Sequence, residues 1–373
     1  MHYYGPQLYL PRPHHLYNRF NFRQIKPTKR ILQSIDELLP NYDFELTNEP
    51  QFLPGQGRSQ TLILRTSQGK KIVKRYKSTV IEPTIIYEHS VLQYLAQIDF
   101  PAPRLVLTKT NESLLTYDHG CYALFDFIEG GLQYHQYILL PRQLRQFIAI
   151  GGKLLADLHD KLQHHTPTGY NPSGFKSKTG ERWRNLDWYT KRLDFCLTKT
   201  SQLIENEANH PLARLWQNHK IIEQTFFKLN TLLEEACLPR LIIHGDYGPY
   251  NLLFRKNAPA IVIDFELTRL DWRLYELTDS LWRFGMDRFV GFNSSKMKIF
   301  MDAYQSHFPI ALEELRHLPS VWKYIHLLRA IKYWYKYCRT PTPGLLKNSY
   351  FHLDMIEYMN TNQDDLMTAL TKM

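Results

Sequence analysis

Three polar residues in the second half of the chain have types and spacing that suit the transfer of a phosphoryl group. Asp246 is followed five positions later by Asn251, and Asp264 comes after one further short segment. A carboxylate such as Asp246 can orient an attacking hydroxyl by accepting its proton. Magnesium prefers oxygen ligands and usually takes only one or two from protein carboxylates, so Asn251 and Asp264 could supply two of them.

Short apolar runs flank these residues and predict the elements that position them. The runs 241–243, 252–254 and 261–263 are rich in β-branched and aromatic residues, as buried strands are. The polar residues would then lie at strand ends around one loop. Taken singly, Asp246 or Asn251 favours an ordinary turn, because both residue types form turn hydrogen bonds. Their combination with Asp264 favours a phosphoryl-transfer site.

The two motifs resemble those of the aminoglycoside phosphotransferase and choline kinase superfamily, which comprises protein-kinase-like small-molecule kinases. There His-Gly-Asp-x-x-x-x-Asn precedes Ile-Asp-Phe or Ile-Asp-Trp, and here these motifs occupy 244–251 and 263–265. The resemblance implies ATP and Mg²⁺ as cofactors. It implies that Asp246 is the catalytic base and that Asn251 and Asp264 bind magnesium. The residue two positions after the second aspartate is Glu266, where protein kinases have glycine, and this favours a small-molecule acceptor.

A clamp for the nucleotide is predicted upstream. Gly55 and Gly57 lie between apolar runs, where glycine would let backbone N–H groups approach phosphates, although this pair alone fits an ordinary turn better. The run 71–76 alternates apolar and basic residues and predicts a strand. Lys74 is the residue expected on the α- and β-phosphates, whereas Lys71 is expected to be solvated.

Acidic and histidine side chains are candidates to support the site. The segment 83–95 has a roughly helical period, and its central acid, Glu88, pairs with Lys74 by resemblance or is otherwise an exposed helix residue. His159 lies on a predicted helix, where a structural hydrogen bond is the better explanation. Glu276 stands where the superfamily has aspartate after the second metal ligand, which leaves its supporting role open.

The chain is expected to fold as two lobes. We predict an N-terminal extension over 1–30, a nucleotide-clamping lobe with an antiparallel sheet over 31–128, and a mostly helical catalytic and substrate-binding lobe over 129–373. This α+β arrangement is the bilobal, protein-kinase-like fold that the resemblance implies. The run 122–131 resembles the strand and hinge between the lobes. Its backbone would hydrogen-bond adenine at Asp126, Phe127 and Ile128.

The composition suits an enzyme inside the cell. The chain has 373 residues, 43% of them hydrophobic, and this length exceeds that of most domains built around a single hydrophobic core. The 4 cysteines are widely spaced and form neither a zinc pattern nor a disulfide framework, so a cytoplasmic location is expected. No run approaches the roughly 18–20 apolar residues of a membrane helix, and the start lacks the order of a signal peptide. We therefore expect no membrane association.

The net charge of +10 raises the question of nucleic acid as a partner. The basic residues are spread among aromatics and acids, which fits a solvated surface and a site that must hold three phosphates. Some nonspecific affinity for polyanions is expected at low salt. The sequence contains no nucleic-acid-binding motif, so we expect no specific nucleic-acid partner, and the oligomeric state is not indicated.

The acceptor is expected to be a small molecule with a hydroxyl group, such as an aminoglycoside-, choline- or homoserine-like compound. The turn-rich and aromatic segment 163–212 is the predicted acceptor-binding region. Acidic pocket residues would suit an aminoglycoside, aromatics a quaternary amine and basic residues an anion, and the segment offers all three. The aromatic run 322–335 has helical spacing that favours core packing. The candidate acceptor contacts are Glu266, Trp183, Asp187 and Trp188.

Two other functions are weaker alternatives. A nucleotide-binding pseudokinase acting through protein interaction would be free to lose its catalytic residues, yet Lys74, Glu88, Asp246, Asn251 and Asp264 are all present. A protein kinase would need an activation segment after the second metal ligand. Too few residues lie between Asp264 and the next helical pattern to form such an activation segment.

Overall fold

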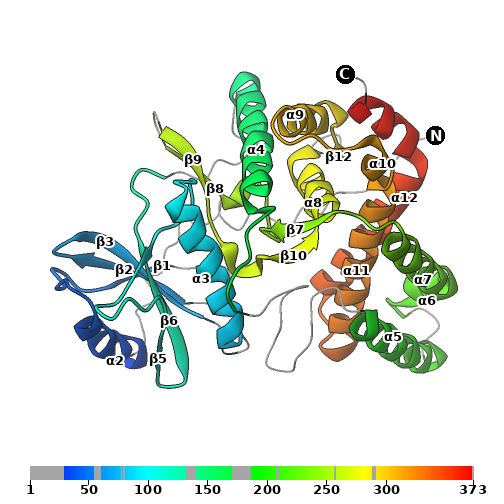
Figure 1. Ribbon diagram of the computed structural model, residues 1–373. Helices are drawn as coiled ribbons and strands as arrows, with labels where there is room; N and C mark the ends of the chain where they lie inside the picture. The colour runs from blue at the N-terminus through cyan, green and yellow to red at the C-terminus, as the bar shows by residue number, and fades with distance from the viewer. Residues whose placement is uncertain are drawn as a thin grey trace.

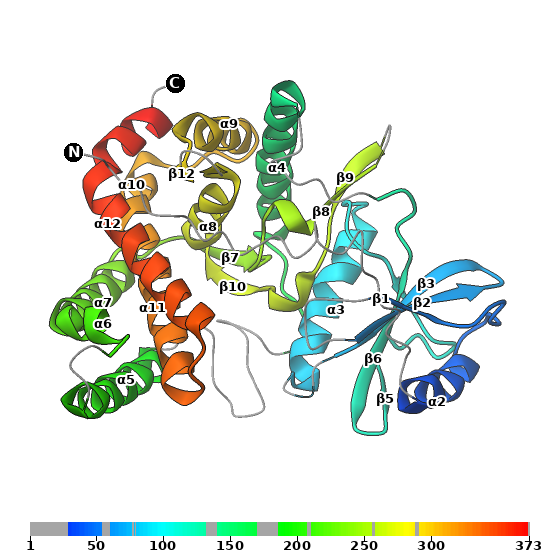
Figure 2. The same ribbon diagram turned by 180° about the vertical axis from the view of Figure 1, so that it is seen from behind.

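The computed structural model describes residues 29–53, 60–76, 78, 80–131, 140–169, 186–206, 210–255, 258–287 and 291–371. Gly55, Gly57 and Trp183 therefore lie outside the described residues. Figures 1 and 2 show a twisted sheet with helices packed against it at one end of the molecule and a larger group of helices at the other. Four short strands lie between these two parts, which confirms the expected α+β arrangement.

The sheet is antiparallel and has the strand order β1-β2-β3-β6-β4, with β5 also pairing with β6. Its strands are β1 (Gln51–Leu53), β2 (Gln60–Thr66), β3 (Gly69–Arg75), β4 (Leu105–Val106), β5 (Leu115–Tyr117) and β6 (Gly120–Asp126). β2 and β3 form an antiparallel hairpin, and β3 contains most of the run that the alternating pattern predicts as a strand. The turn of this hairpin ends at Gly69, whose φ of +90° is readily adopted by glycine.

Successive side chains of β6 point to opposite faces of the sheet, and a different helix packs on each face. Tyr122 and Leu124 pack with α2 (Lys29–Leu38), whereas Ala123 and Phe125 belong to the core that includes α3 (Glu82–Gln97). This follows from the period of two in a strand, which sends neighbouring residues to opposite faces. A short 3₁₀ turn, η1 (Leu39–Asn41), follows α2.

The expectation that Lys71 is a solvated charge is wrong. It is only 8% exposed and pairs with Asp126 on the neighbouring strand, with 2.7 Å between Nζ and Oδ1. The alternating pattern correctly predicts the strand, but a lysine can bury its aliphatic stem while its ammonium group reaches a carboxylate at the strand end. Lys71 is therefore a paired residue rather than a solvated one.

The other end of the molecule is mainly helical and surrounds two short hairpins. The 3₁₀ turns η2 (Pro249–Asn251) and η3 (Phe265–Leu267) accompany the strands β7 (Arg240–Ile243), β8 (Leu252–Arg255), β9 (Ala258–Val262) and β10 (Arg269–Trp272). β7 pairs with β10, and β8 pairs with β9. The helices are α4 (Pro141–Leu162), α5 (Leu186–Asn206), α6 (Ala213–Gln217), α7 (His219–Glu235), α8 (Arg273–Gly285), α9 (Ser294–Gln305), α10 (Leu312–Leu315), α11 (Leu318–Arg339) and α12 (Pro343–Thr371), and the small hairpin β11 (Met286–Asp287) and β12 (Gly291–Phe292) precedes α9.

The aromatic run in α11 packs into the core, as its helical spacing predicts. Trp322, Tyr324 and Trp334 are each at most 2% exposed. The adjacent α12 lies along α11 in both views (Figures 1 and 2). Among the described residues, none of the helices has the length and apolar composition needed to span a membrane.

Close packing of α4 against α9 gives a test of the helical part. A Cβ added at Gly152 would lie 2.3 Å from the carbonyl oxygen of Phe300, and backbone cannot move aside as a side chain can. We expect Gly152→Ala to reduce the free energy of unfolding by about 1–3 kcal/mol, as overpacked cores do. Gly344→Ala is the control, because nothing lies within 4 Å of its added Cβ. Urea denaturation showing equal stability for both variants would contradict this packing.

Candidate active site

A buried carboxylate from α8 fixes the loop between β7 and β8, which carries the predicted catalytic residues. Glu276 accepts hydrogen bonds from the backbone N–H groups of His244 and Gly245, at 2.8 and 2.5 Å. The imidazole of His159 on α4 donates to the same carboxylate at 3.0 Å. Burial alone would raise the pKa of Glu276, but these hydrogen bonds lower it below its usual value. Glu276 therefore supports this loop, and His159 makes the structural hydrogen bond expected of it.

The backbone of the loop requires glycine next to Asp246, the predicted base. Gly245 has a φ of +84°, and a Cβ there would lie 2.2 Å from the carbonyl oxygen of Leu267. The neighbouring His244 donates through Nε2 to the carbonyl of Ile263 at 2.9 Å. Its Nδ1 accepts the backbone N–H of Asp246 at 3.2 Å. These bonds select one tautomer of His244 and join the loop to the end of β9.

Asp246 and Asn251 lie against each other. The amide nitrogen of Asn251 donates to the backbone oxygen of Asp246 at 2.9 Å and to its Oδ2 at 3.3 Å. The hydroxyl of Tyr250 donates to Oδ1 of Asp246 at 3.1 Å. Because the nitrogen of Asn251 faces the loop, its amide oxygen is the atom left to bind a metal ion. The side chain of Asp246 is 29% exposed, so it is partly accessible to solvent.

Asp264 follows β9 in a left-handed backbone conformation, with φ 69° and ψ 63°. Aspartate and asparagine adopt this conformation more readily than most residues. Asp264 as a whole residue is exposed. The protein around it nevertheless raises its pKa by burial, an effect that Lys74 opposes and that the charges of Glu266 and Asp246 reinforce.

The donor set fits a magnesium ion. A cation near Asp264 would relieve the repulsion between this carboxylate and its acidic neighbours, and the amide oxygen of Asn251 is a second hard ligand. In the part of the chain that the structure describes, no group of three or more His, Cys, Asp or Glu side chains is arranged to hold a metal. Such an ion would therefore need phosphate and water oxygens to complete its coordination, as magnesium in kinases does.

Lys74 on β3 points toward three carboxylates. Its Nζ lies 3.3 Å from Glu88 on α3 and 3.5 Å from Glu266 on η3, and the charge of Asp264 acts on it as well. Burial would lower the pKa of Lys74, but these acids raise it above its usual value. The structure thus brings together Lys74 and Glu88, and it places Glu266, a predicted acceptor contact, beside the lysine.

The predicted hinge follows the end of β6. The backbone N–H groups of Asp126 and Phe127 donate to the carbonyls of Arg104 and Lys70, at 2.9 and 3.1 Å. These two donors are therefore used within the protein. Of the three predicted adenine contacts, the backbone N–H of Ile128 is the one with no bond to another described residue.

The described part of the predicted acceptor segment contributes to the packing of α5. Asp187 is exposed in the first turn of that helix. The ring of Trp188 lies 3.1 Å from the guanidinium carbon of Arg192, which also lies 4.7 Å from the ring centre of Tyr335 on α11. The role of Asp187 and Trp188 as acceptor contacts remains a prediction.

Sequence reasoning missed a basic residue that contacts Asp246, the predicted base. Arg283, in the last turn of α8, forms an ion pair with Asp246, with 2.8 Å between Nη1 and Oδ1. It also pairs with Asp279, one helical turn earlier, at 2.9 Å. The spacing of Asp279 and Arg283 is a local signal of an ion pair on a helix. The contact with Asp246 joins residues far apart in sequence, and no local pattern indicates it.

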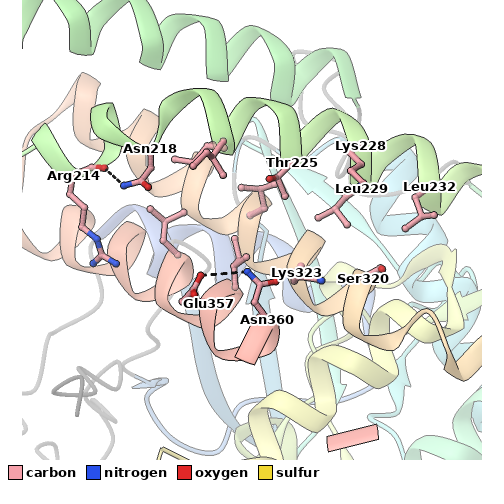
Figure 3. A pocket seen from close by; sticks show the side chains of 15 residues that line it. Arg214, Asn218, Thr225, Lys228, Leu229, Leu232, Ser320, Lys323, Glu357 and Asn360 are labelled. Atoms are coloured by element: carbon pink, nitrogen blue, oxygen red, sulfur yellow. Dashed lines mark hydrogen bonds between the residues drawn. The ribbon is translucent and has the colours of Figure 1, made fainter. Parts of the chain in front are cut away.

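A separate cavity of about 640 Å³ lies between α7, α11 and α12. Figure 3 shows that Thr225 and Leu229 of α7 face Ser320 and Lys323 of α11 across it, with Asn360 of α12 at its side. None of the predicted site residues lines this cavity. It is therefore not part of the candidate active site.

Comparisons with known proteins agree with this geometry. Residues 51–305 match the model of a family described as the phosphotransferase enzyme family. The homoserine kinase of Rhodospirillum rubrum is 25% identical over 291 residues, which cover 77% of this chain and 80% of that protein.

Two solved structures show the same fold. A microcompartment-associated aminopropanol kinase has a TM-score of 0.60 at 16% identity, covering 91% of this chain and 100% of that one. An amicoumacin kinase in complex with AMP-PNP, Ca²⁺ and Ami has a TM-score of 0.61 at 14% identity, covering 91% and 94%. At these identities the likeness establishes the bilobal, protein-kinase-like fold.

The hydrogen bonds of Glu276 can be tested by removing its charge. In Glu276→Gln an NH₂ group would face N–H groups whose hydrogen bonds the carboxylate now accepts. We therefore expect the free energy of unfolding to fall by about 1–3 kcal/mol at pH 7. Because the folded pKa of Glu276 is lowered, its contribution should persist at neutral pH and shrink only as pH falls below about 4. Exposed Glu313→Gln is the control, with an expected change within about 0.5 kcal/mol. Indistinguishable denaturation curves for the two variants at pH 7 would show that Glu276 does not support the loop.

Proposed function

The chain belongs to the phosphotransferase enzyme family, and we propose that it transfers the γ-phosphoryl group of ATP to a hydroxyl of a small molecule in a magnesium-dependent reaction. The observation that carries this proposal is the convergence of Asp246, Asn251 and Asp264 around one supported loop, with the Lys74–Glu88 pair at the same site. These are the groups that phosphoryl transfer requires. The sheet and α3 supply the lysine and its partner, and the helical part supplies the loop.

Asp246 is proposed as the base that receives the proton of the acceptor hydroxyl. Tyr250 and Arg283 hold its Oδ1, and Asn251 holds its Oδ2, so the carboxylate has a fixed orientation. Such orientation aligns the hydroxyl oxygen with the phosphorus atom and with the leaving oxygen of ADP.

Lys74 is proposed to bind the α- and β-phosphates, and Glu88 keeps its ammonium group in position. Asn251 and Asp264 would hold magnesium, which supplies positive charge to the phosphates when it is bound. The kinase solved with AMP-PNP and Ca²⁺ supports a nucleotide and a divalent ion as cofactors of this fold. The adenine would bind at the hinge after β6, with Ile128 as a donor, and the lobes would span 31–128 and 129–373.

A small acceptor is favoured over a protein by the segment that follows the second metal ligand. Between Asp264 and α8 the chain forms only η3 and β10. Its single hydroxyl residue is Thr268, which is 2% exposed and donates to the carbonyl of Ile243 at 2.8 Å. A phosphorylatable activation segment of the protein-kinase type is therefore missing from this stretch of described residues. The homoserine kinase relative makes homoserine a first acceptor to test.

Replacement of the proposed base should separate transfer from nucleotide binding. We expect Asp246→Asn to lower the transfer rate by about 10²–10⁴-fold, because the hydroxyl loses its proton acceptor. Mg-ATP affinity should stay within a few-fold of wild type, as measured by calorimetry. The control Asp302→Asn removes an exposed acid of α9 and should leave both quantities unchanged. Transfer by folded Asp246→Asn at the wild-type rate would exclude this role.

A test of Asp264 as a metal ligand needs a replacement residue that can adopt the same left-handed backbone conformation. Asparagine accepts the left-handed conformation at position 264, so Asp264→Asn should fold while losing one negative charge. We expect Mg-ATP binding and transfer to weaken together, and a higher magnesium concentration to be needed for half-maximal rate. Calorimetry showing unchanged Mg-ATP affinity would mean that Asp264 is not a magnesium ligand.

A further inference from the structure

A chain of alternating charges from α11 and α8 ends at the predicted base. It runs from Arg329 on α11 through Asp279 and Arg283 on α8 to Asp246, and we call these four residues the ion-pair chain. Nη2 of Arg329 lies 2.7 Å from Oδ1 of Asp279, and Nη1 of Arg283 lies 2.8 Å from Oδ1 of Asp246. Each arginine therefore has an aspartate as its partner, and the charges of the chain balance one another.

The guanidinium group of Arg283 contacts a carboxylate on each side. Its Nε donates to Oδ2 of Asp279 at 3.0 Å, and its Nη2 lies 2.9 Å from the same oxygen. Nη1, on the other side of the planar group, reaches Asp246. Because a guanidinium group is planar and rigid, a contact that fixes Nε and Nη2 also fixes the position of Nη1. Asp279 therefore determines where Arg283 meets Asp246.

Arg329 holds the other oxygen of Asp279. Arg283 uses Oδ2, whereas Arg329 uses Oδ1. The guanidinium carbon of Arg329 also lies 4.9 Å from the ring centre of Trp282 on α8, a cation–π contact that packs Arg329 against the helix carrying Asp279. Contacts on both oxygens restrict the rotation of the Asp279 carboxylate. Through Arg329, α11 thus takes part in fixing Arg283.

Stability alone is a poor explanation for these buried charges. The side chains of Asp279, Arg283 and Arg329 are 6%, 10% and 16% exposed. Burial raises the pKa of Asp279 to about 6, an effect that Arg329 opposes and that the charges of Asp246 and Glu276 reinforce. Buried ion pairs contribute little net stability, because loss of water offsets the attraction between the charges. What they do impose is one relative orientation of the charged groups, and the chain ends at the group that needs it.

We propose that Asp279 and Arg329 are positioning residues for phosphoryl transfer, which hold the guanidinium group of Arg283 so that Arg283 orients the carboxylate of Asp246 toward the acceptor hydroxyl. This inference rests on the proposed function and adds two residues that lie outside its sequence motifs. A misoriented base slows transfer, because the hydroxyl oxygen is no longer aligned with the phosphorus atom. Nucleotide binding at Lys74 does not depend on the chain.

The first test compares rate with binding. ADP release by the full-length protein is measured with Mg-ATP and L-homoserine, or with water as the acceptor if homoserine is not a substrate. We expect Arg329→Met to lower kcat about tenfold, with the KM for Mg-ATP within a few-fold of wild type. The loss is smaller than that of the base itself, because Tyr250 and Asn251 still contact Asp246. Arg329→Lys, which keeps the charge, should recover part of the rate, and exposed Arg316→Met is the control.

A double-mutant cycle then identifies the route of the effect. If Asp279 acts through Arg283, Asp279→Asn should lower kcat about tenfold in the wild-type protein but by less than about twofold in an Arg283→Met background. An Asp279 with a separate, structural role would lower kcat by the same factor in both backgrounds. The matched control Asp302→Asn breaks an exposed aspartate–lysine pair one helical turn apart on α9 and should change neither rate.

The outcomes separate this inference from the proposed function. Asparagine has nearly the shape of aspartate, so Asp279→Asn should fold even if Arg329→Met does not. Unchanged kcat in either folded variant, or an equal loss in both backgrounds of the cycle, would overturn the inference. If neither homoserine nor water supports ADP release, a crystal structure of Asp279→Asn decides: departure of Arg283 from Asp246 supports the inference, and an unchanged contact overturns it. Failure of the wild-type protein to bind Mg-ATP would instead overturn the proposed function.

Discussion

The geometry of the loop that carries Asp246 depends on the hydrogen bonds of one buried carboxylate, that of Glu276. A charge that is 2% exposed is strongly unfavourable unless hydrogen bonds replace its water. Here two consecutive backbone N–H groups and the imidazole of His159 do so. Because the backbone donors belong to His244 and Gly245, the carboxylate fixes the chain immediately before Asp246. Any other path of the loop would leave this buried charge without its partners.

The same loop is tied to helices that are remote in sequence. Tyr247 donates its hydroxyl to the carbonyl of Gly151 on α4 at 2.7 Å, and His159 contacts the hydroxyl of Tyr304 on α9 at 2.8 Å. The close approach of α4 and α9 at Gly152 fixes the distance between these two anchors. The helices α4, α8 and α9 therefore form a rigid frame, and the loop is positioned by several independent contacts. Preorganisation of this kind allows a base to act without first being ordered by the substrate.

Local signals explain which features could be predicted from the sequence. Strand alternation and helical period located β3 and α3, and the short motif brought Asp246 and Asn251 together because only one turn separates them. Burial of Lys71 was missed because alternation predicts the face of the strand on which a residue lies but not the residue that it contacts there. The contact of Arg283 with Asp246 was missed for a related reason. It depends on how α8 packs against the loop, and this packing is set by the whole core rather than by nearby residues.

Charge is distributed unevenly on the two sides of Asp246. On one side, Lys74 faces Glu88, Glu266 and Asp264, so three carboxylates lie around one ammonium group. On the other side, Arg283 contacts Asp246, and Asp279 pairs with both Arg283 and Arg329. A divalent cation would balance the first side and would be repelled by the arginines of the second. The field of the protein itself would therefore hold such an ion on the side of Lys74 and Asp264, with Asp246 between the ion and the arginines.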